Sequence, residues 1–541
     1  MSKVRAAKAA AIGINAMRQP SVKPADIGPA TERVFEGRAR FANLIGIALW
    51  TATMTFFWLW WLRGDHIIGW PSYLLVTLLL VWITGLPAYF IFIIHDARRM
   101  PQGGGPLPAG RIALVVTRAC HEPLSVVQAT LQAALDQVGC DFDVWLIGAN
   151  PDLEMMKWCM EHGVFTSTAP KGVEASSPCR EAILTSFYDR FGYERYDFVA
   201  QLDADHLPDK TYLREMIRPF RDPGVGYVSA PDISDVNVAS SWAARGRLFA
   251  EAGIRGLLQA GYNNGWAPLC TGAHRAARTA ALKEIGGLKP EREGGRSTTL
   301  AMNAGGWRGV HALDAIAHGN GSATFADLMA QEFDQSRNRV TALLQYSRPY
   351  LPKLPGWLKF QFLFSQLWYP LFSLSLAVIF TLPIMALLTG HSFVDVTYPA
   401  FLLHFLPIVG ALIALAFIWR ATGTFRPADA KIVNWENTAF LLLRWPWSLI
   451  GTAAAIRDYL THASSGVRVT RTETAAAQAL PLRVVAPYIV ISLASALAMA
   501  FAVAPEAAPG LFVFATINAV IYAALIVLIT VRHAMESTVS R

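Results

Sequence analysis

The chain has 541 residues, of which 53% are hydrophobic and only 16% are charged. Soluble domains carry about a quarter charged residues, so a water-soluble fold of the whole chain is excluded. The formal net charge of +8 does not indicate a nucleic-acid partner, because the basic residues gather beside apolar runs and form no stripe with aromatic residues. The five cysteines form no CxxC pair, as expected in a reducing cytosol.

Six apolar runs are long enough to cross a hydrocarbon core, which takes about 20 helical residues. Two precede a globular middle region and four follow it: Phe41–Leu62, Pro71–Ile94, Leu371–Leu388, Pro399–Trp419, Val484–Val503 and Leu511–Val531. The segments Gly356–Tyr369 and Asn437–Leu460 mix Trp, Arg and Lys with apolar residues, which predicts helices in the membrane interface. A spanning Asn437–Leu460 is the alternative, and Arg444 in its middle argues against it.

The loops between these runs differ in charge. Lys and Arg occur before the first run, after the second and in 420–431, 457–483 and 532–541, whereas 389–398 and 504–510 contain neither. Basic loops face the cytosol, which predicts a multi-pass inner (plasma) membrane protein with both termini inside. Its expected parts are a cytosolic segment 1–40, two spans in 41–94, a cytosolic domain 95–350, and the interfacial helices, a connecting loop and four spans in 351–541.

The middle region alternates strand-like and helix-like segments. The runs 112–117 (IALVVT), 142–148 (FDVWLIG) and 196–205 (YDFVAQLDAD) are short and apolar, and an amphipathic segment follows the first. This spacing predicts an α/β domain with a parallel, doubly wound sheet. In such sheets ligands bind at the carboxyl ends of the strands.

Asp203 and Asp205 close the third of these runs and are separated by one residue. Both carboxylates are therefore expected to project into one crevice and share a divalent cation, either Mg²⁺ or Mn²⁺, that bridges a diphosphate. Taken alone, the spacing also fits two loop-capping aspartates. His206 either caps the crevice or fills the loop. Cys270 and His274 lack partners at ligand spacing, so we expect them in the core or in a groove.

Further stretches carry a resemblance when read with this pair. They are the turn His121-Glu122-Pro123, the motif Asp203-Ala204-Asp205-His206, the segment 269–288 that ends near a Gly-Gly pair, the stretch 305–317 and the segment 467–473 (VRVTRTE). Their order resembles the processive membrane family-2 glycosyltransferases, the relatives of cellulose synthase and hyaluronan synthase, over most of residues 40–530. Several motifs in order are more specific than any one of them.

The resemblance implies a GT-A-like cytosolic α/β domain set between membrane helices that form a channel for a growing polymer. It implies that Asp203 and Asp205 bind the metal and that Asp203 also contacts the donor. Glu122, and Val469 and Thr470 in the stretch similar to the FxVTxK gating loop, are implied to contact substrate. The implied partners are a nucleotide sugar, with a UDP-sugar as the first expectation, a polysaccharide acceptor and membrane lipid.

Two nucleotide-binding motifs of that family are altered here. The family's uridine-binding aspartate is replaced by Gly148-Ala149-Asn150, which leaves Asp152 as the nearest acid. Its KxGN segment appears as Arg180-Glu181-Ala182-Ile183, in which Arg180 is the candidate substrate contact.

Two motifs that belong to the chemistry are altered as well. The family's TED motif, whose aspartate is the general base, corresponds to Glu293-Gly294-Gly295-Arg296. Glu293 is the candidate base, and the alternative is that it is a solvated acid of the loop. Its QxxRW motif corresponds most nearly to residues 336–340, where Arg337 and Arg339 remain and are expected to face the diphosphate.

Two functions follow from this pattern. The first is an inverting, nucleotide-sugar-dependent hexosyltransferase of the cellulose-synthase type that extends and exports a polysaccharide. The second is a catalytically weakened relative that keeps the fold and works as a partner subunit of an active synthase. A transporter fits less well, because the spans lack acidic residues and the middle domain is large.

Overall fold

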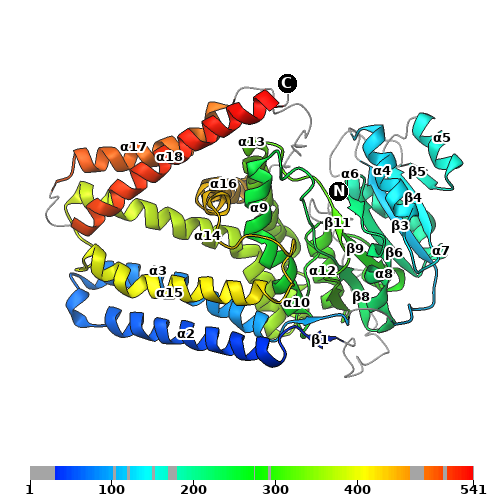
Figure 1. Cartoon of the computed structure of the whole chain (residues 1–541), viewed down its shortest axis with the longest axis horizontal. Coiled ribbons are helices and arrows are strands. Elements are labelled where there is room, and N and C mark those ends of the chain that lie inside the picture. Colours follow the sequence, from blue (N-terminus) through cyan, green and yellow to red (C-terminus); the bar gives the residue numbers. More distant parts are fainter. Residues whose placement is uncertain are drawn as a thin grey trace.

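The computed structural model describes residues 31–101, 105–118, 122–148, 153–168, 179–272, 274–289, 294–462, 480–503 and 509–539. Its sheet lies at one end of the molecule and its long apolar helices at the other (Figure 1). Asp152, Glu293, Val469 and Thr470 lie outside the described residues, and of Arg180 only the backbone is described. Their expected roles therefore remain predictions.

The main sheet of the described region has seven strands in the order β10-β8-β9-β6-β3-β4-β5. The strands are β3 (Ile112–Arg118), β4 (Asp143–Gly148), β5 (Phe165–Thr168), β6 (Phe198–Asp203), β8 (Val225–Ser229), β9 (Arg275–Arg278) and β10 (Arg308–His311). The three strands expected from the sequence are present as β3, β4 and β6 and pair in parallel.

One strand departs from the expected parallel sheet. β9 runs antiparallel to both β6 and β8, with Arg275 opposite Gln201 and Ser229. Because Gln201 and Ser229 lie near the carboxyl ends of their strands, the chain enters β9 from that same edge of the sheet. The entry segment before β9 therefore lies beside the end of β6, where Asp203 stands.

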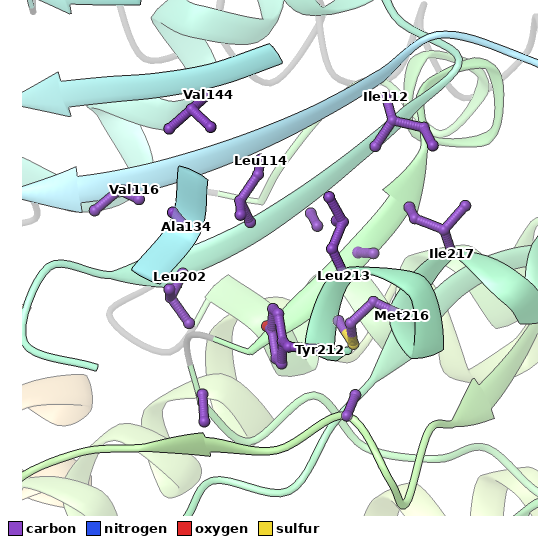
Figure 2. Packing of buried hydrophobic residues seen from close by; sticks show 14 of the residues in the cluster. Ile112, Leu114, Val116, Ala134, Val144, Leu202, Tyr212, Leu213, Met216 and Ile217 are labelled. Carbon is purple, nitrogen blue, oxygen red and sulfur yellow. The ribbon is translucent and has the colours of Figure 1, made fainter. Parts of the chain in front are cut away.

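Helices cover both faces of the sheet. Ile112, Leu114 and Val116 of β3 lie on the same side as α4 (Leu124–Leu135) and α8 (Tyr212–Ile217), as Figure 2 shows for Leu213 and Ile217. Ala113 and Val115 point to the opposite core, which includes α6 (Cys179–Phe187), α11 (Thr279–Glu284) and α12 (Gly294–Ala304). Burial on both faces explains why the β3 sequence is continuously apolar.

The remaining elements of the sheet domain are short or lie at its borders. They are β1 (Glu32–Arg33), β2 (Arg98–Arg99), α5 (Leu153–Glu161), α7 (Tyr193–Arg195), β7 (Leu207–Pro208), α9 (Trp242–Gly253), α10 (Gln259–Tyr262), β11 (Ala317–His318) and α13 (Phe325–Thr341). β7 follows directly after the Asp203 loop and pairs antiparallel with β11. α9 and α13 lie between the sheet and the apolar helices (Figure 1).

Seven of the described helices are long and apolar enough to cross a membrane, one more than the sequence suggested. They are α2 (Gly37–Trp61), α3 (Trp70–His95), α14 (Gly356–Thr389), α15 (Tyr398–Arg420), α16 (Trp435–Leu460), α17 (Leu482–Ala500) and α18 (Pro509–Val539). An α/β domain joined to a group of long apolar helices confirms the expected fold class.

Two segments expected as separate interfacial helices behave differently. The segment Gly356–Tyr369 does not end before the span Leu371–Leu388, because α14 continues through Pro370 as one 34-residue helix. The segment Asn437–Leu460 is α16, the additional apolar helix. Figure 1 shows α16 end-on while α2, α14 and α15 lie lengthwise, so α16 crosses their direction.

Candidate functional site

The two aspartates of the DADH motif stand at the carboxyl end of β6, as their spacing predicts. β6 ends at Asp203, and Thr117 opposite it on β3 donates its hydroxyl to Asp203 Oδ1 at 2.9 Å. Asp205 Oδ1 lies 2.8 Å from His206 Nδ1. The end of β6 thus places two carboxylates and an imidazole at the carboxyl edge of the sheet.

Two further residues join this group from elsewhere in the chain. Asp232 follows β8 and lies 3.7 Å from His206 Nε2, and His274 precedes β9. Ligand atoms of His206, Asp232 and His274 lie within 4.8 Å of one another, as do those of Asp203, Asp205 and His206. Asp232 was not predicted from the sequence, where its only signal is its position three residues after a strand of the same sheet. His274 was expected in the core or in a groove.

The imidazole of His274 has the tautomer and the neutral charge that a metal ligand needs. Its Nδ1 lies 3.0 Å from the carbonyl oxygen of Pro231, which can only accept, so Nδ1 carries the proton. The Nε2 atom is buried and has no hydrogen-bond partner among the described residues. Burial and the neighbouring His206 lower the pKa of His274 to about 4, so the ring is neutral at physiological pH. A backbone carbonyl that holds the second nitrogen is typical of metal-binding histidines.

This donor set fits a divalent cation. Carboxylate oxygens from Asp203, Asp205 and Asp232 suit Mg²⁺ or Mn²⁺, and an imidazole nitrogen favours a transition metal over Mg²⁺. Although burial opposes protonation of His206, hydrogen bonds to Asp205 and Asp232 raise its pKa to about 10. Burial also opposes ionisation of Asp232, but Arg255 and His206 hold its pKa well below the usual range.

Two cavities meet beside these residues. The first, here named the strand-end cavity, has a volume of about 520 Å³ and is lined by Asp203, His206, Asp232, Arg247, Arg255 and Gln335, among others. The second, here named the junction cavity, has a volume of about 210 Å³ and reaches α3, α14 and α16. Asp232, Arg247, Arg255 and Gln335 line both cavities, so the polar space at the sheet adjoins a space between the helices.

The arginines expected to face a diphosphate occupy different places. Arg337 on α13 donates from Nε to Asp458 of α16 at 2.9 Å, so its described partner lies on α16. Arg339, two residues further, lines the junction cavity and lies over the Tyr369 ring at 4.4 Å. The two side chains therefore do not converge on one group.

The other expected contacts are placed as follows. Glu122 precedes α4, near the carboxyl end of β3, and its backbone oxygen accepts from Arg118 at 3.2 Å. Glu181, next to Arg180 on α6, is buried in an ion pair with Arg275 at 2.8 Å. That pairing is internal to the sheet domain.

The expected catalytic acid belongs to residues 293–296, and within this segment a side chain at Gly295 would not fit. A Cβ atom there would lie 2.8 Å from both Arg275 Nη1 and the carbonyl oxygen of Cys270. The following residue, Arg296 on α12, lines the junction cavity. The described part of this motif therefore contributes a cation to the junction cavity where the resembled family has an acid.

Comparison with known proteins gives structural similarity only. No family model matches the chain, and no curated protein matches it. A mannosyltransferase from Pyrobaculum calidifontis, solved with GDP-Man and Mn²⁺, is similar at 14% identity and a TM-score of 0.43, covering 77% of this chain and 99% of that one.

Two other solved structures are similar over shorter parts. The TarS protein of S. aureus has 15% identity and a TM-score of 0.32, covering 61% of this chain and 55% of its own. Glucosyl-3-phosphoglycerate synthase from Mycobacterium tuberculosis, with Mn²⁺, UDP-glucose and phosphoglyceric acid, has 12% identity and a TM-score of 0.30, covering 46% and 81%. Because these TM-scores are below 0.5, the similarities assign no function to this chain.

Proposed function

We propose that the protein is a membrane-bound glycosyltransferase of GT-A type that uses a nucleotide sugar and a divalent cation. The observation that carries the proposal is the group of Asp203, Asp205 and His206 at the end of β6, beside a second group in which the same His206 meets Asp232 and His274, next to the strand-end cavity. A cation held there neutralises the diphosphate that leaves the sugar. The carboxylates orient that charge at the edge of the sheet where ligands of such folds bind.

The residues around the cation have separate tasks. Thr117 holds Asp203 in place through its hydroxyl, and Pro231 holds the tautomer of His274. Arg247 and Arg255 line both cavities, where the strand-end cavity adjoins the junction cavity. A sugar transferred at this place would have their positive charge beside it, which stabilises negative charge that develops during transfer.

The finer form of this proposal follows the family resemblance of the sequence. In that form the protein is an inverting hexosyltransferase of the cellulose-synthase type that takes a UDP-sugar and extends a polysaccharide exported between its apolar helices. The Lys and Arg asymmetry of the loops supports placing the sheet domain in the cytosol, at the inner membrane.

A second candidate function is a pseudoenzyme that binds a nucleotide sugar and acts as a partner subunit of an active synthase. Gly295 and Arg296 favour it, since the described part of the base motif has no carboxylate. Inverting transfer to a neutral hydroxyl needs a base, which contributes about 10²–10⁴-fold in rate.

Calorimetry on the full-length protein tests the proposal. With Mn²⁺ present, UDP- and GDP-sugars are titrated into the wild type and into Asp203→Asn and Asp205→Asn. Each variant is expected to lose metal-dependent binding, while Asp141→Asn, at an exposed site away from the cavity, is expected to retain it. Equal binding in all four proteins would overturn the proposal. Turnover of the bound nucleotide sugar then separates the enzyme from the pseudoenzyme.

A further inference from the structure

Two histidine rings beside the strand-end cavity have Nδ1 engaged and Nε2 left for a ligand. Nδ1 of His206 lies 2.8 Å from Asp205 Oδ1, and Nδ1 of His274 lies 3.0 Å from the carbonyl oxygen of Pro231. His274 is 2% exposed, and its Nε2 has no hydrogen-bond partner in the described part of the chain. The two rings are neighbours, because their centroids lie 4.6 Å apart. A buried imidazole nitrogen without a partner points to a ligand at this place.

Asp232 completes a group of three with these rings. Its Oδ1 lies 3.7 Å from His206 Nε2, and its Oδ2 lies 3.4 Å from Arg255 Nη1. One carboxylate oxygen thus faces an arginine and the other faces a histidine. Ligand atoms of His206, Asp232 and His274 lie within 4.8 Å of one another. A tetrahedral ion with bonds of about 2.0–2.1 Å holds its ligand atoms about 3.4 Å apart, so small side-chain shifts would close this group on an ion.

The outer partners of these three side chains are of the kind that metal ligands have. Each ligand has one such partner: Asp205 for His206, the Pro231 carbonyl for His274, and Arg255 for Asp232. A carboxylate or a backbone carbonyl that accepts from the second ring nitrogen fixes the tautomer and the orientation of a metal-binding histidine. The group therefore combines ligand atoms at suitable distances with the contacts that hold them in place.

We propose that His206, Asp232 and His274 bind a zinc ion that is separate from the cation on Asp203 and Asp205. Two imidazoles, one carboxylate and an open fourth position are typical of zinc sites that bind a water or a substrate. Nitrogen ligands favour zinc, whereas Mg²⁺ prefers oxygen ligands and keeps bound waters. The inference goes beyond the proposed function, because this ion does not depend on a nucleotide sugar.

The open position of this ion would face the strand-end cavity, which His206 and Asp232 line. A water is the fourth ligand when no substrate is bound, and the ion polarises the oxygen that it binds. The ion takes the place of the proton on His206 Nε2, while the Nδ1 proton stays in its hydrogen bond to Asp205. Asp205 would therefore contact both ions, one as a direct ligand and the other through His206.

Metal analysis of the full-length protein tests the inference without a nucleotide sugar. The protein is purified without a polyhistidine tag and equilibrated with Zn²⁺ in excess Mg²⁺, and the bound metal is counted by mass spectrometry. We expect the wild type to hold Zn²⁺. In competition with a chelator, His274→Ala and His206→Ala are each expected to weaken Zn²⁺ binding about 100-fold or more, because loss of an outer partner alone costs about 10–100-fold. His162→Ala, at an exposed site, is the matched control and is expected to bind as the wild type does.

X-ray absorption at the zinc edge identifies the ligands in the wild type, so it does not depend on how the variants fold. Two imidazole ligands at about 2.0–2.1 Å are expected. A zinc ion with oxygen ligands alone would contradict the inference. So would a wild type that holds no Zn²⁺ in excess Mg²⁺, or undiminished Zn²⁺ binding in both histidine variants.

Asp203→Asn separates the two ions. This variant is expected to lose Mg²⁺-dependent binding of a nucleotide sugar but to keep Zn²⁺, because Asp203 is not a ligand of the proposed zinc ion. Loss of Zn²⁺ in this variant would indicate one shared cation site, and the inference would fail. If the wild type holds Zn²⁺ as expected but binds no nucleotide sugar in calorimetry, the proposed function fails while the zinc site stands.

Discussion

Arg444 of α16 and Glu332 of α13 form an ion pair at 2.8 Å in which both side chains are buried. The same two helices approach closely nearby, since Ser336 donates its hydroxyl to the carbonyl oxygen of Ser448 at 2.6 Å. α13 belongs to the sheet domain side and α16 to the apolar helices (Figure 1). The pair therefore joins the two parts of the molecule beside the junction cavity.

Removing one partner of this pair should destabilise the protein strongly. In Glu332→Gln the Arg444 guanidinium stays buried without its carboxylate, which costs about 3–5 kcal/mol. Glu32→Gln removes a pair of similar length, to Arg99, that is partly exposed and contributes about 0–1 kcal/mol. Thermal unfolding of both variants in detergent measures the difference. Similar midpoints for the two variants would show that the buried pair does not join the parts.

His274 should contribute to metal selectivity. Because its Nε2 is the nitrogen ligand of the proposed site, His274→Ala is expected to lower the affinity for Mn²⁺ by about tenfold or more, and the affinity for Mg²⁺ less. Competition binding with the two ions measures both effects. His162→Ala, an exposed histidine on the far side of the sheet domain, is the control. Unchanged Mn²⁺ affinity would remove His274 from the ligand set.

The loop charges predict an orientation in the membrane that is open to direct measurement. An impermeant thiol reagent applied to intact cells is expected to label His391→Cys, in the loop between α14 and α15, but not Glu194→Cys on the sheet domain. Both positions are exposed, so access depends on the side of the membrane. After permeabilisation both should react. The reverse pattern in intact cells would invert the topology.

Stability should depend on pH through His318 on β11, the strand that pairs with β7 next to the Asp203 loop. Its Nδ1 lies 2.8 Å from Asp235, and this hydrogen bond raises the pKa of His318 above its usual 6.5. A raised folded-state pKa stabilises the fold fully below about pH 6.5, and this contribution is lost as the pH rises through the folded pKa. Asp235→Asn should therefore lower the melting temperature more at about pH 6 than at about pH 9. An equal reduction at both values would exclude this pair as the source.

Much of the fold could be predicted because its strands and apolar helices appear as continuous segments of the sequence. The runs 112–117, 142–148 and 196–205 correspond to β3, β4 and β6, and the run Pro71–Ile94 to α3 (Trp70–His95). A short continuous apolar run is typical of a buried strand, and a run of about 20 apolar residues is typical of a membrane-spanning helix. The reversed direction of β9 was missed, since Arg275–Arg278 is short and carries two arginines that an apolar pattern does not detect.

Some residues of the candidate site could likewise be predicted from the sequence, and others could not. Asp203 and Asp205 are recognisable in the sequence because one strand end positions both, and alternation along a strand is a local property. Asp232 and His274 reach the same point only through the pairing of β8 and β9. The arginines of the junction cavity come from α9, the helical segment Ile254–Leu258 that follows it, α12, α13 and α16, some 200 residues apart at the extremes. Such long-range neighbours depend on how sheet and helices pack, which no local pattern records. The sequence accordingly revealed the carboxylates for a cation, while packing alone assembled the cationic cavity beside them.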